Sequence, residues 1–251
     1  MSGHSKWSTI KRKKAKVDAQ RGVAFQKFSR EIIMATKIGG EDPSANFRLR
    51  TAIERAKQAG LPNSNIKAAI DRGCGANSAE NFEELSYEGY ANSGVAVFIE
   101  AMTNNRNRTA GDIRSYFTKY QGNLGESGCV AWMFKQVGLI TFSQEYNQDT
   151  LLQLALEAEA EDFIAEDDEY KIFTKPEDLQ KVSDALEKEG YTPKSAEITR
   201  IPENTIQIQD EQAAILILRL IDKLEEHDDV QNVYANFDID EELMEKIEDK
   251  I

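Results

Sequence analysis

Apolar residues in the first 75 positions recur with the period of α-helices. Phe25, Phe28 and Ile32 share one face of a segment that the turn residues of "KIGGEDP" (37–43) end. A second helix is predicted to begin near Asn46 as its cap and to stop before Gly60 and Pro62. A third is predicted over 63–73. Three short amphipathic helices predict a small N-terminal helical bundle.

The period changes after "GCGANSAEN" (73–81), which has the glycine-rich, polar composition of a linker. Residues 85–91 and 94–102 are predicted to form strands joined by a turn at "NSG". A helix is predicted over 107–120, with Ile113, Tyr116 and Phe117 as its buried stripe. "GNLGESG" then breaks the chain before a further strand-like run, "CVAWMF" (129–134).

The segments of residues 138–202 follow the order β-α-β-β-α-β, which predicts a ferredoxin-like unit. A strand (204–208), a helix (210–226) and a strand (230–239) follow, and they can complete the α/β layer begun by residues 84–119. The expected fold is therefore α+β with three domains. A basic helical domain (1–76) precedes a discontinuous α/β domain (77–135 and 203–251), into which an acidic ferredoxin-like domain (136–202) is inserted. Simple sequential domains are the competing interpretation.

Composition limits the class of protein. No apolar run approaches the roughly 18 residues that span a bilayer, so no contact with a membrane is expected. The basic start is not followed by the apolar region of a signal peptide. Two cysteines are too few for a disulfide framework, which favours the cytoplasm. With two histidines, they lack the paired spacing of a zinc site, and we expect neither a metal nor a cofactor.

Charge divides the chain sharply. Residues 1–75 contain 16 basic and 6 acidic residues, a net charge of +10, whereas residues 76–251 contain 15 and 38, a net charge of −23. This asymmetry predicts a basic module that binds a polyanion and an acidic body that does not. The alternatives are a solvated tail or a transit peptide, but such peptides are rich in Arg and Ser, and here Lys dominates.

The basic residues between positions 11 and 16 cannot all share one helical face, which suits an arm that follows a phosphate backbone. Such contacts give affinity and salt dependence but carry no sequence information directly. Trp7 could stack on a base, but such a residue more often anchors an arm to its own domain. The predicted nucleic-acid-binding residues are Lys6, Lys11, Arg12, Lys13, Lys14, Lys16, Arg21, Arg48 and Arg50.

A secondary anion site is predicted at Arg106 and Arg108, which flank the start of the helix over 107–120. Asn107 or Thr109 could equally be a plain helix cap. "GNLGESG" lacks the Lys-Ser/Thr of a P-loop and favours a tight connection. No pairing of nucleophile and base is visible, so we expect neither an enzyme nor a small-molecule substrate.

Acidic residues are densest between positions 157 and 169, without the spacing of an EF-hand. A run of this kind usually forms a solvated face. It would repel nucleic acid, and it could receive a basic protein partner.

Several stretches together resemble the YebC/PmpR family: "GHSKWSTIKRKKAKVDAQRG", "FSREIIMA", "GGEDPSANFRLRTAIERA", "YEGYANSGVAVFIEAMTNNRNRTAGDIR", "GNLGESGCVAWMF" and "DDVQNVYANFDI". The resemblance covers nearly the whole chain and implies a three-domain cytoplasmic protein with a helical first domain. This sequence departs from the family pattern at Asn104, at Cys129 and at "YANSG".

Bacterial members of that family are named as probable transcriptional regulators, which implies a DNA-binding transcriptional regulator. A mitochondrial relative is a translational activator of cytochrome c oxidase. That relative implies the alternative, a ribosome-associated translation factor that binds ribosomal or messenger RNA. A Lys-rich arm binds either phosphate chain, so the residues fit both.

Overall fold

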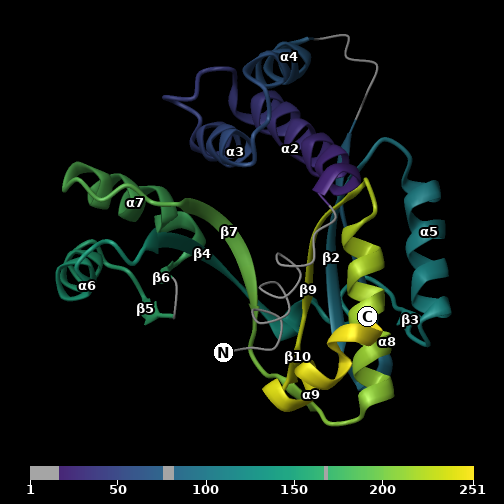
Figure 1. Cartoon of the computed structure of the whole chain (residues 1–251). Helices are drawn as coiled ribbons and strands as arrows, with labels where there is room; N and C mark the ends of the chain where they lie inside the picture. The colour runs from purple at the N-terminus through teal and green to yellow at the C-terminus, as the bar shows by residue number, and fades with distance from the viewer. Residues whose placement is uncertain (1–16, 76–81, 167–168) are drawn as a thin grey trace. The chain divides into compact units, whose positions relative to one another are not determined.

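The computed structural model describes residues 17–75, 82–166 and 169–251 (Figure 1). The chain divides into two compact units. The first takes its described residues from Met1–Met34, Gly75–Phe134 and Pro202–Ile251, and the second consists of Ala35–Cys74 and Lys135–Ile201. The boundary between residues 34 and 35 falls inside helix α2 (Val17–Gly39).

The first unit contains a four-stranded sheet in the order β3-β1-β2-β9, with antiparallel pairing between neighbours. A separate pair, β8 with β10, is parallel. Besides the first part of α2, its elements are β1 (Glu83–Tyr90), β2 (Ala96–Thr103), α5 (Arg106–Lys119), β3 (Asn123–Leu124), β8 (Ile206–Ile208), α8 (Glu211–Glu225), β9 (Val230–Ala235), β10 (Phe237–Ile239) and α9 (Glu241–Ile247).

Helices α5 and α8 cover one face of this sheet (Figure 1). Ile113 and Phe117 on α5 are fully buried, as their helical spacing predicts. They pack in one cluster with the apolar face of α8 and with Val97 and Ile99 of β2. Asp210 caps α8 by accepting a hydrogen bond from the amide of Ala213 at 2.7 Å. These contacts fix α5 and α8 against the sheet.

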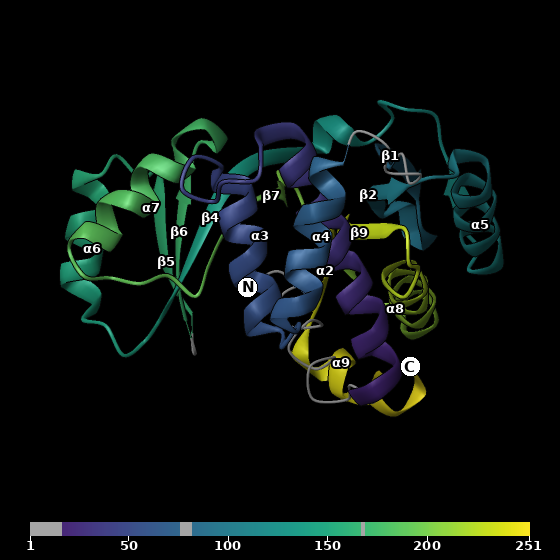
Figure 2. The ribbon, with the colours of Figure 1, turned by 90° about the horizontal axis from the view of Figure 1, so that it is seen from above.

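The second unit contains a four-stranded sheet in the order β5-β6-β4-β7. Its helices α6 and α7 lie on one face (Figure 2) and bury their apolar residues against Ile140, Phe142 and Ile172. The β-α-β-β-α-β order confirms the ferredoxin-like prediction. The elements are α3 (Phe47–Gln58), α4 (Asn63–Cys74), β4 (Phe134–Ser143), α6 (Gln148–Glu157), β5 (Asp162–Ala165), β6 (Glu169–Thr174), α7 (Leu179–Lys188) and β7 (Ser195–Pro202).

Asn46 caps α3, as the sequence predicts. Its side-chain oxygen accepts a hydrogen bond from the amide of Leu49 at 3.0 Å. Its side-chain nitrogen donates to the carbonyls of Ala35 and Gly40, each at 2.8 Å. The buried side-chain amide of Asn46 therefore sets both the start of α3 and the path of the turn before it. Arg48 and Arg50 lie in the first turn of that helix.

Two predictions of secondary structure are corrected, and one helix was not predicted. Residues 129–133 do not form a strand, and β4 begins only at Phe134. Ala131–Met133 is a 3₁₀ turn, because the amides of Val130 and Ala131 bind the carboxylate of Glu88 and not another strand. The predicted strand 230–239 divides at Asn236, whose side chain accepts a hydrogen bond from the amide of Ala96. Helix α9 was not predicted, although Met244 and Ile247 are buried on it.

Candidate nucleic-acid interface

Most of the predicted basic arm lies outside the described residues. The predicted binding residues outside the described part of the chain are Lys6, Lys11, Arg12, Lys13, Lys14 and Lys16. Arg21 lies in the first part of α2. Contact between these seven residues and a nucleic acid stays a prediction.

Arg50, on α3, is held by the acidic part of its own unit. Its Nη2 donates to Oδ1 of Asp184 at 2.6 Å, and its guanidinium lies 5.2 Å from the centre of the Phe47 ring. Arg55, one turn further on, forms an ion pair with Glu197 at 2.7 Å. Arg48 is half-buried in the first turn of the helix. The acidic residues of the ferredoxin-like part therefore compensate two of the cations that the sequence offers for binding.

Other cations of α3 and α4 are exposed. Lys57 and Lys67 line an open groove of about 520 Å³ between the two helices, and Arg72 lies exposed at the end of α4. Glu54 and Asp71 line the same groove. Burial raises the pKa of Glu54, and the negative charge of Glu187 raises it further. Because acids and bases alternate along this groove, it is a weaker attractor for a polyanion than a run of lysines.

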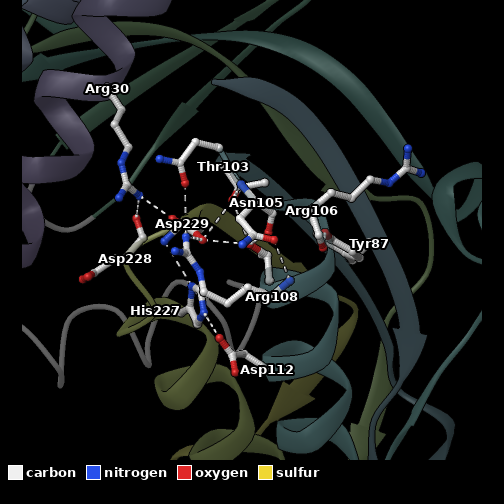
Figure 3. A network of polar contacts seen from close by, with 12 residues as sticks. Arg30, Tyr87, Thr103, Asn105, Arg106, Arg108, Asp112, His227, Asp228 and Asp229 are labelled. Carbon is white, nitrogen blue, oxygen red and sulfur yellow. Dashed lines mark hydrogen bonds and ion pairs between the residues drawn. The ribbon is translucent and has the colours of Figure 1, made fainter. Parts of the chain in front are cut away.

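Arg106 and Arg108 begin α5, and the helix cap is Asn105, not Asn107 or Thr109 (Figure 3). The side-chain oxygen of Asn105 accepts a hydrogen bond from the amide of Arg108 at 3.1 Å. The amide of Asn105 in turn donates to the hydroxyl of Thr103 at 2.9 Å. The last residue of β2 thus places the cap two residues earlier than the sequence suggested.

The carboxylate of Asp229 is the centre of the network around this helix start (Figure 3). Its side chain is only 2% exposed, and Arg108 binds its Oδ2 at 2.7 Å. The hydroxyls of Thr109 and Thr103 donate to the same oxygen at 2.7 and 3.1 Å. Arg30 of α2 forms an ion pair with Oδ1 at 2.9 Å. Asp229 therefore joins α2, α5 and the loop before β9.

Two opposing effects act on the pKa of Asp229. Burial raises it, but the hydrogen bonds from Arg108 and Thr109, the charge of Arg30 and the bond from Thr103 outweigh burial, so the pKa lies below its ordinary value. The group is therefore a carboxylate at neutral pH. Arg108 is engaged by this charge, whereas Arg106 is exposed. An anion site at this helix start stays a prediction.

His227 supports the same loop. Its Nδ1 accepts a hydrogen bond from the amide of Asp229 at 3.1 Å, which places the ring proton on Nε2. Nε2 lies 3.2 Å from Oδ2 of Asp112 on α5. The ring of Tyr116 meets the imidazole edge-on, with 6.0 Å between the ring centres. The histidine therefore positions the backbone of Asp229.

The acidic run of the ferredoxin-like part also forms internal ion pairs. Lys181 bonds to Glu159, Lys135 binds Glu161 at 3.1 Å, and Lys171 binds Glu166 at 2.5 Å. Among residues 17–75, 82–166 and 169–251, no group of three or more His, Cys, Asp or Glu side chains could hold a metal ion. A basic protein partner for this face stays a prediction.

Sequence analysis missed Trp132. The composition of "CVAWMF" predicts a strand, in which a tryptophan would pack into the sheet. In the structure Trp132 lies on the 3₁₀ turn with most of its side chain exposed. The available signal was the glycine spacing of "GNLGESG" immediately before it, which indicates a tight turn and not the approach to a strand.

No helix in the described part of the chain combines the length and the apolar composition needed to cross a membrane. Comparison with solved structures finds the crystal structure of a conserved hypothetical protein from Aquifex aeolicus. The TM-score is 0.82 and the identity 50%, over 90% of this chain and 93% of that one. The α+β fold is therefore shared with an experimentally determined relative.

Comparison with known sequences gives relatives that match from end to end. A "probable transcriptional regulatory protein" of Pelotomaculum thermopropionicum is 56% identical over 244 residues, which are 96% of this chain and 100% of the relative. A protein of the same description from Natranaerobius thermophilus is 52% identical, over 98% of this chain and 99% of its own length.

The family comparison covers both parts of the chain. Residues 5–76 match the TACO1/YebC protein N-terminal domain, and residues 82–237 match the TACO1/YebC second and third domain. The predicted domain boundaries at 76, 135 and 202 stay a prediction. The matches and the full-length relatives show that this chain belongs to the TACO1/YebC family, which the sequence resemblance had indicated.

Proposed function

We propose that this protein is a nucleic-acid-binding regulator, and specifically a DNA-binding transcriptional regulator that holds the phosphate backbone through its basic N-terminal segment. The separation of charge carries the proposal: residues 1–75 have a net charge of +10 in a protein whose total is −13. Full-length relatives named probable transcriptional regulatory proteins support it. The protein acts in the cytoplasm, by binding and not by catalysis.

The physics of such binding is counterion release. Each phosphate that a lysine or arginine neutralises releases condensed cations, so log affinity falls linearly with log salt concentration. The slope is about −0.9 per contact for duplex DNA and about −0.7 for single strands. The cations between positions 11 and 16 supply the densest positive charge of the chain, and the acidic body supplies the repulsion that orients it.

A translation factor that binds ribosomal or messenger RNA is the second candidate. The sequence resemblance to a family that includes a mitochondrial translational activator supports it, and the matched family models are described as TACO1/YebC domains. The same arm would contact either polyanion, and the acidic face of the ferredoxin-like part would then meet a basic protein partner. Binding by the arm therefore does not tell DNA from RNA, and the target in the cell has to be identified by a separate experiment.

The experiment replaces Lys11, Arg12, Lys13, Lys14 and Lys16 by Ala and measures affinity for duplex DNA and for RNA across a salt series. We expect weaker binding to all sequences and a slope flatter by about 0.7 to 0.9 per lost contact. A matched control replaces exposed lysines of the second unit, Lys175, Lys188 and Lys194, and should leave the slope unchanged. An unchanged slope in the arm variant would refute the proposal.

Sedimentation of cell lysate through a gradient separates the two targets. Co-migration with ribosomal subunits that survives DNase and disappears with RNase supports the translation factor. Co-migration with DNA that is lost on DNase treatment supports the transcriptional regulator. The arm variant should lose either association, because both depend on the same phosphates.

A further inference from the structure

Trp132 is 67% exposed, although Val130 and Phe134, two residues away on either side, are buried. Val130 and Phe134 pack in a small cluster with Ala96 and Phe98 of β2. The 3₁₀ turn Ala131–Met133 therefore brings the chain to the surface for a single turn. Within the described part of the first unit, Trp132 is the one large apolar side chain with most of its surface exposed.

The backbone of this loop is held by Glu88, a residue of β1 that is only 4% exposed. The amide of Gly128 donates to Oε1 of Glu88 at 2.7 Å, and the amides of Val130 and Ala131 donate to Oε2 at 2.8 Å. Three charge-assisted hydrogen bonds to one carboxylate fix the approach to the tryptophan. The loop is therefore ordered before any partner binds, and binding costs it little conformational entropy.

Two glycines allow this tight path. Gly128 has a φ of +91°, a conformation that a residue with a side chain rarely adopts. A Cβ at Gly125 would lie 2.6 Å from the sulfur of Cys129. Both positions belong to "GNLGESG", a motif whose glycine spacing predicts a tight connection. The glycine spacing therefore serves to present the tryptophan.

The polar group of the indole is already satisfied. Nε1 donates to the carbonyl of Cys129 at 3.1 Å, and the hydroxyl of Tyr90 donates to the same oxygen at 3.1 Å. This bond orients the ring and leaves its π-faces as the available surface. A protein pocket that anchors a tryptophan usually bonds its N–H, whereas a stacked base needs only the face of the ring.

The surroundings also favour a base over a protein. Residues 125–128 are exposed and consist of two glycines, a glutamate and a serine, so the ring projects from a polar loop. The centre of a protein interface is a contiguous, well-packed apolar patch around its hot spots. A single oriented ring suits one unpaired base, and every base has a π-face.

We propose that Trp132 stacks on an unpaired nucleobase of the nucleic acid whose phosphates the basic arm holds. This inference rests on the proposed function, because the arm supplies the affinity that brings the strand to the protein. Stacking adds affinity without neutralising phosphate, so it does not contribute to the salt slope. The two effects can therefore be measured separately.

The test uses the two tryptophans of the chain. In the Trp7→Phe protein, Trp132 is the one tryptophan that remains, and its fluorescence is followed while oligoadenylate is added, as RNA and as DNA. The same titration with an abasic strand of equal length provides a control with the same phosphates and no bases. We expect quenching by both adenine strands and none by the abasic strand.

Affinity is then measured for Trp132→Ala and Trp132→Phe. The alanine variant should bind oligoadenylate about 5- to 150-fold more weakly, which corresponds to about 1–3 kcal/mol. The phenylalanine variant should recover most of that loss, and neither variant should change the salt slope. Leu156→Ala, at another mostly exposed apolar residue, is the matched control and should bind normally.

Three results would overturn the inference: equal quenching by the abasic strand, an alanine variant with parental affinity, or a phenylalanine variant as weak as alanine. Loss of ribosome association in Trp132→Ala without any quenching by oligonucleotides would also overturn it and indicate a protein partner. Failure of the proposed function has a different signature, an unchanged salt slope in the arm variant. Circular dichroism verifies that each variant is folded.

Discussion

Replacing Asp229 by asparagine should destabilise the first unit strongly, although it changes a single atom. The carboxylate receives Arg108, Thr109 and Thr103 on one oxygen and Arg30 on the other. Asparagine keeps one acceptor, but it loses the charge and presents an N–H₂ group to one of the two guanidinium groups. At least one cation therefore faces a donor where it had an acceptor.

The magnitude follows from burial. Removing one partner of a buried ion pair costs about 3–5 kcal/mol. The side chain of Arg108 is 50% exposed, so water replaces much of its lost interaction, whereas that of Arg30 is 16% exposed and recovers less. Arg30 keeps its bond to the carbonyl of Asp228. We therefore expect a loss of about 2–4 kcal/mol in the free energy of unfolding.

The pH dependence gives an independent measure. The folded-state pKa of Asp229 is lowered from an unfolded value of about 3.9. Its carboxylate therefore stabilises the fold fully above that value, and the stabilisation is lost as the pH falls through the lower, folded pKa. The difference between the parent and Asp229→Asn should be largest at neutral pH and should narrow in acid.

Urea unfolding of the Trp7→Phe protein measures this difference, because the fluorescence of Trp132 reports on the unit that contains Asp229. Asp228→Asn is the matched control, since Asp228 is exposed and offers Arg30 only its backbone carbonyl. The control should stay within about 0.5 kcal/mol of the parent. Equal stability of the two variants at pH 7, or a gap that persists unchanged in acid, would refute the reasoning.

Two further predictions concern the Trp132 loop and the second unit. Glu88→Ala should lower the free energy of unfolding by about 1–3 kcal/mol for each buried amide that it leaves without an acceptor. It should also lower the fluorescence anisotropy of Trp132 in the Trp7→Phe protein. Glu126→Ala, in the exposed part of the loop, is the control and should change neither quantity. Residues 136–202 expressed alone should be folded, as measured by circular dichroism, and should unfold at a lower temperature than in the whole chain. The reason is that they lose the packing of Phe47 and the ion pairs of Asp184 and Glu197. A segment that stays unfolded would favour sequential domains.

The local sequence pattern was sufficient to predict a helix where residues of that helix determine where it begins and which face it buries. Asn46 caps α3 because its side chain bonds an amide three residues away, and the apolar spacing of Ile113 and Phe117 records the buried face of α5. The order of strands and helices in the ferredoxin-like part could be predicted for the same reason. Its strands and helices follow one another as separate short segments in the order β-α-β-β-α-β.

The wrong predictions arose where backbone amides bond to a side chain that is distant in the sequence and not to a neighbouring strand. "CVAWMF" has the composition of a strand, but the carboxylate of Glu88, more than forty residues earlier, takes the amides that a strand would offer to a neighbour. Asn236 ends β9 through the amide of Ala96, and Asp229 binds cations from two distant helices. Nothing in the local sequence distinguishes these acceptors from ordinary surface residues.

The same pairing changes what the charge asymmetry means. Counted by sequence, Arg50 and Arg55 belong to the basic segment, yet each is bound by a carboxylate from 135–201. A phosphate that took either arginine would leave Asp184 or Glu197 without its cation, so the exchange gains little. The cations that can add affinity are those without such a competitor built into their own unit. Under the proposed function, the ferredoxin-like part would therefore remove Arg50 and Arg55 from the set of cations that can bind phosphate. Under the same proposal, the salt slope should therefore depend mainly on the lysines and arginine of the arm, and each of these that contacts a phosphate should add to it.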